Sequence, residues 1–356
     1  MALTVRDIAA ADSPAFDGHE RMVFADDPES GLYAIIAIHH TGRGPAFGGL
    51  RMRPYRDVRQ ALDDALKLSR AMTYKSAICE LPFGGGKAVV LGDPRTDKTP
   101  ALLHAMGRAV NALGGAYLVA EDLGTTLRDM AVMREVSAHV RGVADEAGAP
   151  TPATAYGVLK ALEAAVAHRF GARGLDGVTV AVQGLGSVGA RLCGYLAEAG
   201  ARLIVADTDE LAVARLRAQV PARAVAPEAI LGTRADVFAP CALGGVIDAA
   251  AVPRLAAPVV VGAANNQLAR PEVADRLAAA GILWVPDYLA NAGGVIDVAH
   301  EGRGYDPRTV LEACERLYGI TAEVLARADA EGVTPSRIAD RLAEQRFTRT
   351  PRRRVA

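Results

Sequence analysis

A glycine pattern placed between an apolar strand and a helix constrains the fold of this 356-residue chain more than any other feature. The pattern G-x-G-x-x-G at 184–189 follows the apolar run 178–183, and the next apolar run ends at Asp207. In that setting the glycines permit a tight turn, a close approach of backbone to a pyrophosphate, and close packing of the helix on the strand. An acidic side chain at 207 would accept hydrogen bonds from ribose hydroxyls and repel a 2′-phosphate, which favours NAD over NADP. The residues expected to contact the dinucleotide here are Gly184, Leu185, Gly186, Ser187, Val188, Gly189 and Asp207.

Apolar runs and helical segments alternate from residue 177 onwards. Short apolar runs that are separated by helices indicate a parallel sheet covered on both faces. The sequence therefore predicts a doubly wound Rossmann domain in the C-terminal half. Its further strands are expected at 202–207, 236–240, 258–264 and 282–287, and its helices at 187–200, 210–219, 307–328 and 335–347.

The length predicts about two domains, since a domain averages roughly 150 residues. A Pro- and Gly-rich segment at 141–154 predicts a linker or hinge between them, with a helix at 155–170 after it. The part before the linker mixes strands and helices. Its strands are expected at 32–39 and 88–91, and its helices at 57–72 and 102–113.

Composition excludes several classes of function. A net charge of -1 and a pI near 6.7 argue against broad electrostatic binding to nucleic acid or to an anionic membrane. The N-terminus has no apolar signal segment, and no stretch is apolar over the roughly 18 residues of a membrane span. The four cysteines are far apart and form no C-x-x-C motif, so no metal site is indicated. We therefore expect a cytoplasmic protein whose arginine-rich end, 346–354, is a solvated terminus.

Lysine is scarce, with five residues among the 40 basic ones, and two of the five flank a run of three glycines. These are Lys75 and Lys87, around Gly84-Gly85-Gly86. The segment is not a phosphate-binding P-loop, because Leu81 and Ala88 stand where that motif needs Gly and Ser or Thr. Three glycines would bring the backbone close to a bulky neighbour and leave Lys87 in a pocket, where burial lowers its pKa and allows general-base chemistry. The alternative is a surface lysine after a flexible turn.

Nine sequence blocks occur in register along almost the whole chain. Together they resemble the amino acid dehydrogenases of the glutamate/leucine/phenylalanine/valine dehydrogenase superfamily. The blocks are GPAFGGLR at 44–51, MTYK at 72–75, GGGK at 84–87, AEDLGTT at 120–126, TAYG at 154–157, GLGSVG at 184–189, APCALG at 239–244, GAANN at 262–266 and PDYLANAGG at 286–294.

The resemblance implies an α/β fold of two domains with a cleft between them. An N-terminal mixed-sheet domain over 1–145, with 331–356 packing back on it, would bind substrate and form the oligomer. The Rossmann domain over 150–330 would bind NAD. A homo-oligomer of undefined size is implied.

The resemblance also implies a mechanism. Lys87 would be the general acid/base that deprotonates the attacking water, and Asp122 would exchange protons with the amino group. Lys75 would pair with the substrate carboxylate, and the backbone carbonyl of Gly49 would face the amino group. The implied reaction converts an L-amino acid, NAD⁺ and water into a 2-oxo acid, ammonia and NADH.

Further cofactor contacts are implied by the matching positions. Thr154 would hold the nicotinamide carboxamide, and Asn265 would lie near both the substrate carboxylate and the nicotinamide. The remaining implied cofactor contacts are Arg51, Asp122, Ala242, Leu243, Ala263 and Ala264.

The side chain of the substrate would be read by Phe47, Ala120, Val295 and Val298. Glutamate dehydrogenases have a lysine in place of Phe47, so a side-chain carboxylate here would be buried unpaired at high cost. The aliphatic Val295 and Val298 favour valine, leucine or isoleucine. Phe47 stands where the branched-chain enzymes have leucine, and its ring would either shrink the pocket toward valine or favour phenylalanine.

Two other functions stay open as alternatives. An NAD-binding regulatory protein without catalytic activity would not need Lys75, Lys87, Asp122 and Asn265 together. A dehydrogenase acting on a hydroxy acid would give no reason for the paired lysines.

Overall fold

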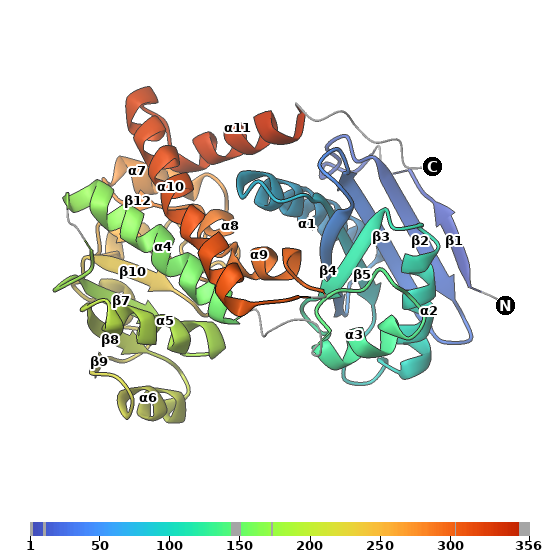
Figure 1. The fold of residues 1–356 in the computed structure, drawn as a ribbon, viewed down its shortest axis with the longest axis horizontal. Coiled ribbons are helices and arrows are strands. Elements are labelled where there is room, and N and C mark those ends of the chain that lie inside the picture. The colour runs from blue at the N-terminus through green and yellow to red at the C-terminus, as the bar shows by residue number, and fades with distance from the viewer. Residues whose placement is uncertain (1–2, 10–11, 144–150, 172–173, 303, 349–356) are drawn as a thin grey trace. The chain divides into compact units, whose positions relative to one another are not determined.

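The computed structural model describes residues 3–9, 12–143, 151–171, 174–302 and 304–348. The chain, drawn in Figure 1, divides into two compact units. The first unit comprises Met1–Gly148, Val298–Tyr305 and Leu342–Ala356, and the second comprises Ala149–Asp297 and Asp306–Arg341. The middle of the expected hinge, 144–150, and the end of the arginine-rich tail, 349–356, lie outside the described residues.

The first unit is built on a six-stranded mixed sheet with the order β1-β2-β3-β5-β4-β6. The strands β1, β2, β3 and β5 pair antiparallel, whereas β4 pairs parallel with both β5 and β6. The elements are β1 Thr4–Asp7, β2 Arg21–Asp27, β3 Leu32–His40, β4 Ala46–Arg53, α1 Val58–Ile78, β5 Gly84–Leu91, α2 Pro100–Asn111, β6 Tyr117–Glu121 and α3 Leu127–Arg134.

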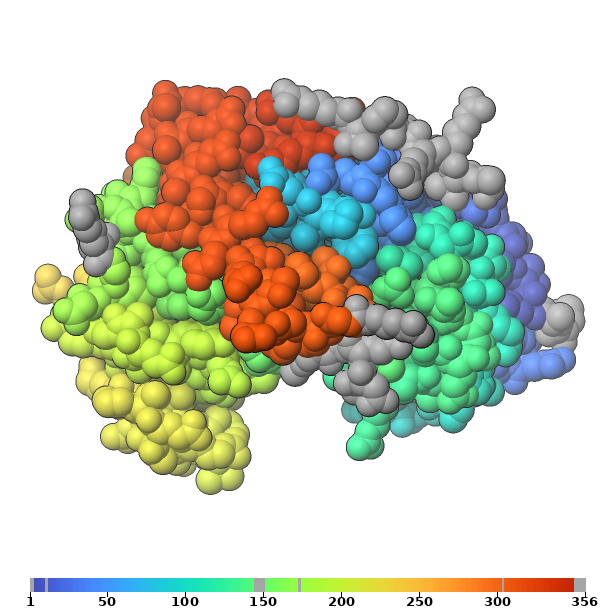
Figure 2. All heavy atoms as spheres, in the orientation of Figure 1, coloured from blue at the N-terminus to red at the C-terminus, as the bar shows by residue number. Residues whose placement is uncertain are grey.

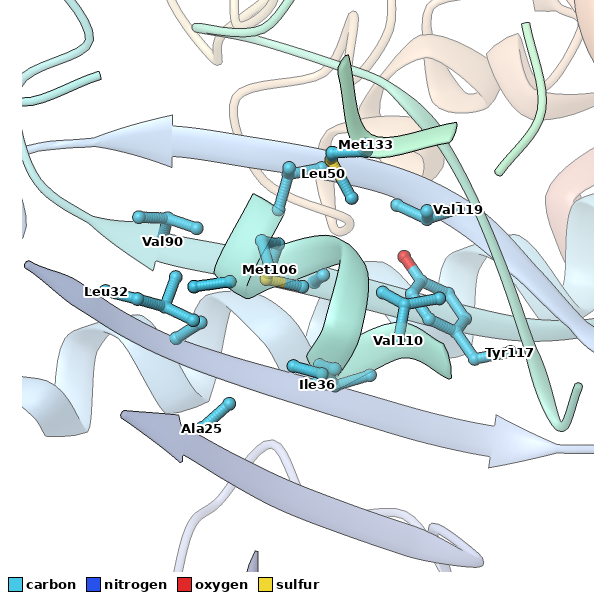
Figure 3. Packing of buried hydrophobic residues seen from close by; sticks show 14 of the residues in the cluster. Ala25, Leu32, Ile36, Leu50, Val90, Met106, Val110, Tyr117, Val119 and Met133 are labelled. Carbon is cyan, nitrogen blue, oxygen red and sulfur yellow. The ribbon is translucent and has the colours of Figure 1, made fainter. Parts of the chain in front are cut away.

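Side chains of this sheet alternate between two buried faces. On one face, Val90 and Tyr117 pack with Met106 of α2, in the cluster that Figure 3 shows. On the other face, Val89 packs with Leu66 of α1. Residues of β4 to β6 that share the face of Val89 therefore point toward α1.

Two elements of this unit are longer than the sequence predicts. The strand expected at 88–91 begins at Gly84, so the glycine run and Lys87 lie inside β5. The helix expected at 57–72 continues to Ile78 and includes Lys75, with Asp57 as its N-cap. The glycines fit a strand because a Cβ on Gly85 would overlap the backbone of Thr73, so only glycine lets α1 lie this close to β5.

The second unit contains a six-stranded sheet with the order β12-β11-β10-β7-β8-β9, in which every pairing is parallel. The strand order reverses between β7 and β10, which is the switch point where doubly wound sheets bind their ligands. The predicted α/β fold class is thus confirmed. The strands are β7 Thr179–Gln183, β8 Arg202–Ala206, β9 Ala222–Ala224, β10 Val237–Pro240, β11 Val259–Val260 and β12 Leu283–Trp284.

Helices cover both faces of the second sheet. Ala181 and Phe238 pack with Leu277 of α7 on one face, and α4 and α5 pack on the other, with α10 against α4. The helices of this unit are α4 Thr151–Phe170, α5 Ser187–Glu198, α6 Glu210–Arg217, α7 Val273–Ala279, α8 Asp287–Ala290 and α10 Pro307–Glu331, with 3₁₀ turns η1 Ile230–Gly232 and η2 Val252–Arg254. Two further helices, α9 Gly293–Ala299 and α11 Pro335–Thr348, begin in this unit and end with residues of the first.

The strands β11 and β12 pair over two residues each, fewer than the runs at 258–264 and 282–287 predict. The long helix α10 is capped at its C-terminus by Gly332, whose φ of 65° is left-handed. The orange-red spheres of α10 form part of the surface in Figure 2. In the part of the chain that the structure describes, no helix is long and apolar enough to cross a membrane.

Candidate active site

Lys87 and Arg51 project from the face of the first sheet that packs on α1. Lys87 lies two residues before Val89 on β5, and Arg51 is paired in register with Val89 from β4. Asp122 follows directly after β6, which pairs with the other edge of β4. Three neighbouring parallel strands therefore bring together residues that are up to 71 positions apart in the chain.

Lys87 and Arg51 share one oxygen of Asp122. The ammonium nitrogen Nζ of Lys87 lies 2.9 Å from Oδ2 of Asp122, and Nε of Arg51 donates to the same oxygen at 2.8 Å. Lys87 is 4% exposed, whereas the side chain of Asp122 is 27% exposed. A buried lysine thus contacts a carboxylate that solvent or a small ligand reaches.

Burial lowers the pKa of Lys87, and the nearby Arg51 guanidinium lowers it further, although Asp122 acts in the opposite direction. Burial alone would raise the pKa of Asp122, but the Lys87 and Arg51 cations outweigh it and lower that pKa. A lysine whose pKa is below its ordinary value can accept and release a proton nearer to neutral pH. The arrangement is suited to moving a proton between Nζ of Lys87 and Oδ2 of Asp122.

The hydroxyl of Tyr117 holds the backbone around Gly49. Its hydroxyl donates to the carbonyl of Gly48 at 2.9 Å and lies 3.3 Å from that of Gly49. A Cβ on Gly49 would press on the Cβ of Asp122 at 2.7 Å, so glycine is needed for Asp122 to lie here. The role of Tyr117 is not predictable from the sequence, because nothing there marks its hydroxyl as a partner of a carbonyl 68 residues away.

Three residues that the sequence analysis also missed anchor the loop after Asp122. The Thr125 hydroxyl accepts from the backbone amide of Asp122 at 3.0 Å and donates to the carbonyl of Leu50 at 2.8 Å. Lys98 donates to the carbonyl of Gly124 at 3.1 Å and pairs with Asp129 of α3 at 2.7 Å. The capping box of Thr126 and Asp129 at the start of α3 would have marked this turn in the sequence.

The expected substrate-binding residues lie on several elements. Lys75 is half-buried in the last turn of α1, and Phe47 and Ala120 are buried on β4 and β6. The ring of Phe47 packs against that of Phe83, with centroids 5.3 Å apart. Val295 and Val298 lie one turn apart on α9, the first buried and the second half-buried.

The glycine loop of the second unit has a cradle for a dinucleotide. A Cβ on Gly184, whose φ is 96°, would meet Ala242 at 2.7 Å, and a Cβ on Gly189 would overlap the carbonyl of Gly184. Gly186 caps α5 without any side-chain hydrogen bond, and a Cβ there would meet nothing within 4 Å. The space beside Gly186, at the start of α5 and at the switch point, is thus open, and a pyrophosphate would need such space.

Asp207 follows directly after β8 and contacts the glycine loop. Its carboxylate accepts from the amide of Leu185 at 2.6 Å and from that of Asp209 at 2.8 Å. Although partial burial opposes it, these amides hold the pKa of Asp207 below its usual value. The carboxylate is therefore charged, as hydrogen bonding to ribose hydroxyls requires.

The remaining expected cofactor contacts surround the ends of β10 and β11. Ala242 and Leu243 are exposed after β10, and Asn265 is exposed after β11, where its Oδ1 accepts from Nδ2 of Asn291 at 2.9 Å. Asn291 also donates to the carbonyl of Ala263 at 3.1 Å, so it holds this loop, a role that the sequence analysis did not assign. The other two positions are Ala264, buried beside this loop, and Thr154, half-buried on α4.

Within the described ranges, no group of three His, Cys, Asp or Glu side chains is arranged to hold a metal ion.

Comparisons with known proteins match most of the chain. A family model described as "Glu/Leu/Phe/Val dehydrogenase, dimerisation domain" matches residues 19–139, and one described as "Glutamate/Leucine/Phenylalanine/Valine dehydrogenase" matches residues 207–304. Leucine dehydrogenase of Geobacillus stearothermophilus is 46% identical over 332 residues, which cover 92% of this chain and 90% of that one. Valine dehydrogenase of Streptomyces virginiae is 45% identical over 337 residues, covering 93% and 94%. The crystal structure of L-tryptophan dehydrogenase from Nostoc punctiforme superposes with a TM-score of 0.84 at 40% identity, covering 94% and 97%.

Proposed function

The chain belongs to the glutamate/leucine/phenylalanine/valine dehydrogenase family, and from that premise we propose that it deaminates a branched-chain L-amino acid with NAD⁺. The expected enzyme class, an amino acid dehydrogenase, is confirmed by these relatives. The proposed reaction converts the amino acid, NAD⁺ and water reversibly into the 2-oxo acid, ammonium, NADH and a proton. The observation that carries the proposal is the buried Lys87 ammonium against the partly exposed Asp122 carboxylate.

The second unit fits a dinucleotide. A Cβ on Gly186 of its glycine loop would meet nothing within 4 Å, and Gly186 caps α5 without a side-chain hydrogen bond. Asp207 carries a negative charge that would repel the 2′-phosphate of NADP, which supports NAD as the cofactor. When bound, the nicotinamide supplies the hydride acceptor for the Cα–H bond of the substrate.

The first unit would perform the proton transfers. We assign to Lys75 the pairing with the substrate α-carboxylate, and to Asp122 the acceptance of a proton from the substrate ammonium. Lys87, as the neutral amine, would take a proton from the water that attacks the substrate iminium carbon, and it would return that proton when ammonia leaves. The 2.9 Å between Lys87 and Asp122 lets one proton pass between them without crossing bulk water.

The apolar side-chain subsite favours branched aliphatic substrates. Phe47 and Ala120 share the face of Lys87 and are buried, so a substrate carboxylate beside them would be left unpaired. Packing against Phe83 holds the Phe47 ring in place, which supports a small pocket suited to valine. Phenylalanine and other aromatic amino acids are the second candidates, since one ring can stack on another.

The assembly and the location of the protein belong to the same proposal. The matched N-terminal model is described as a dimerisation domain, which supports a homo-oligomer formed through the first unit. We propose a cytoplasmic enzyme whose partners are its amino acid and 2-oxo acid substrates, with no role in binding nucleic acid or membrane.

The test is a comparison of kcat/KM for L-valine, L-leucine, L-isoleucine and L-phenylalanine with NAD⁺ and with NADP⁺. We expect the branched-chain substrates to be preferred with NAD⁺, and NADH oxidation in the reverse direction to need ammonia. A higher kcat/KM for phenylalanine would favour the aromatic alternative. If no amino acid yields NADH, the non-catalytic dinucleotide-binding protein is the remaining alternative. If an oxo acid is reduced without ammonia, the protein is a hydroxy-acid dehydrogenase.

A further inference from the structure

A second acidic residue, Asp64, contacts the Arg51 that pairs with Asp122 beside Lys87. The Arg51 guanidinium that contacts Asp122 through Nε also donates through Nη1 to Oδ2 of Asp64, at 3.2 Å. The hydroxyl of Tyr55 donates to the same Asp64 oxygen at 2.7 Å. A continuous chain of contacts thus runs from Tyr55 through Asp64, Arg51 and Asp122 to Lys87.

This chain of contacts is largely shielded from solvent and is built on regular elements. Arg51 lies on β4 with 18% of its side chain exposed, and Asp64 lies in the second turn of α1 with 22% exposed. Tyr55 is fixed in the connection between them, where the Arg53 guanidinium stacks 4.6 Å from its ring centroid. Ion pairs that are held this way between a strand and a helix have defined geometry, unlike flexible surface pairs.

We propose that Asp64 is a positioning residue, which with Tyr55 fixes Arg51 against Asp122 and offsets the charge that Arg51 places beside Lys87. Two cations share a single oxygen of Asp122, so the group of Lys87, Arg51 and Asp122 carries one surplus positive charge when Lys87 is protonated. Asp64 supplies a second anion, and it contacts Nη1 of Arg51 rather than the Nε that contacts Asp122. This inference rests on the proposed role of Lys87, and it adds Asp64 as a group that influences the pKa of that lysine.

The charges around Lys87 predict the direction in which each substitution shifts its pKa. The charges that act on Lys87 are those of Asp122 after β6, Arg51 on β4 and Asp64 on α1. The same packed elements also carry Lys75 on α1 and His39 on β3, and β3 places the apolar Ala37 opposite Lys87. Burial is the largest cause that lowers the pKa of Lys87. Among the charges, Asp122 and Asp64 raise this pKa, whereas Arg51 lowers it. Removing the Asp64 charge should therefore lower this pKa, and removing the Arg51 charge should raise it.

The experiment compares the pH dependence of kcat/KM for oxidative deamination in the wild type, Asp64→Asn and Arg51→Gln. Asparagine keeps a hydrogen-bond acceptor for Arg51 and loses only the charge. We expect the acid limb, where Lys87 gains its proton, to move to lower pH in Asp64→Asn and to higher pH in Arg51→Gln. Asp63→Asn is the matched control, because Asp63 is the adjacent residue on α1, pairs with Ser13, and should leave the profile unchanged.

If the ion pair of Arg51 and Asp64 had only a structural role, both variants would lose activity while the acid limb stayed at its wild-type pH. That result would overturn the inference. Shifts in the same direction would also overturn it. If Asp64→Asn does not fold, the pH profile of Arg51→Gln is the test. An acid limb at the wild-type pH in that variant would contradict the claim that these charges shift the pKa of Lys87. Failure of the proposed function is visible separately, as a wild-type protein that forms no NADH from any amino acid.

Discussion

At the residue scale, burial distinguishes Lys87, the proposed acid/base, from the other lysines. Lys87 is almost wholly buried against Asp122, whereas Lys67 is exposed on α1 and Lys160 pairs with Glu163 on α4. The scarcity of lysine draws attention to all five positions equally. The glycine run narrows them to Lys75 and Lys87, and the folded arrangement of β4, β5 and β6 shows that Lys87 is the one buried against a carboxylate.

Phe47 provides a test of substrate size at the same scale. Leucine in its place would remove the ring that packs on Phe83 and would leave room for one more methylene of the substrate. We expect Phe47→Leu to raise the ratio of kcat/KM for leucine over that for valine by about tenfold, the usual effect of one methylene. Phe24→Leu on β2, away from these residues, is the control that should keep the wild-type ratio. An unchanged ratio in Phe47→Leu would show that this ring does not read the substrate.

His39 makes a prediction about stability. Burial lowers the pKa of His39 from 6.5 to about 3, with His19 contributing in the same direction. Between these values the unfolded chain binds a proton that the folded chain does not, so the free energy of unfolding falls as the pH falls. Urea unfolding near neutral pH and at about pH 4.5 should show this loss, and His39→Gln should lose less over the same interval. Equal losses in the two proteins would remove His39 as the cause.

At the element scale, the sequence predicts the C-terminal unit well and the N-terminal unit less well. Apolar runs such as 178–183 and 202–207 alternate with helices and match β7 and β8 closely. The strands β4 and β5, by contrast, contain glycines and charged residues, a composition typical of turns. They are strands because Gly48 and Gly85 allow neighbouring backbone to approach, a contact between distant segments that local sequence does not encode.

The close approach of β5 and α1 can be tested with one methyl group. In Gly85→Ala the added Cβ would overlap the backbone nitrogen and hydroxyl of Thr73, so we expect a loss of about 1–3 kcal/mol or more in the free energy of unfolding. The matched control is Gly194→Ala in α5, where a Cβ meets nothing within 4 Å. There alanine should stabilise the helix by up to ~1 kcal/mol. Thermal or urea unfolding measures both, and a Gly85→Ala protein as stable as the wild type would contradict the packing described for β5.

At the scale of the whole molecule, the two units divide the proposed chemistry between them. The motif blocks of the sequence contain Lys87, Asp122 and the glycine loop, and the family resemblance implied a role for each. Asp64 was missed because it lies in an ordinary helical stretch, 13 residues from the Arg51 that it contacts. Supporting residues of this kind are defined by distances in the folded unit, which a single sequence does not contain.

The central claim is that Lys87 moves protons during amino acid oxidation, and substitution of this residue tests it most directly. With saturating NAD⁺ and the preferred amino acid, Lys87→Ala should lower kcat by roughly 10²–10⁴-fold, the usual contribution of a general acid/base. Lys87→Arg should be similarly impaired, because arginine keeps its proton at working pH. Lys67→Ala, exposed on α1, should retain the wild-type kcat. A folded Lys87→Ala protein whose kcat is close to that of the wild type would contradict the account.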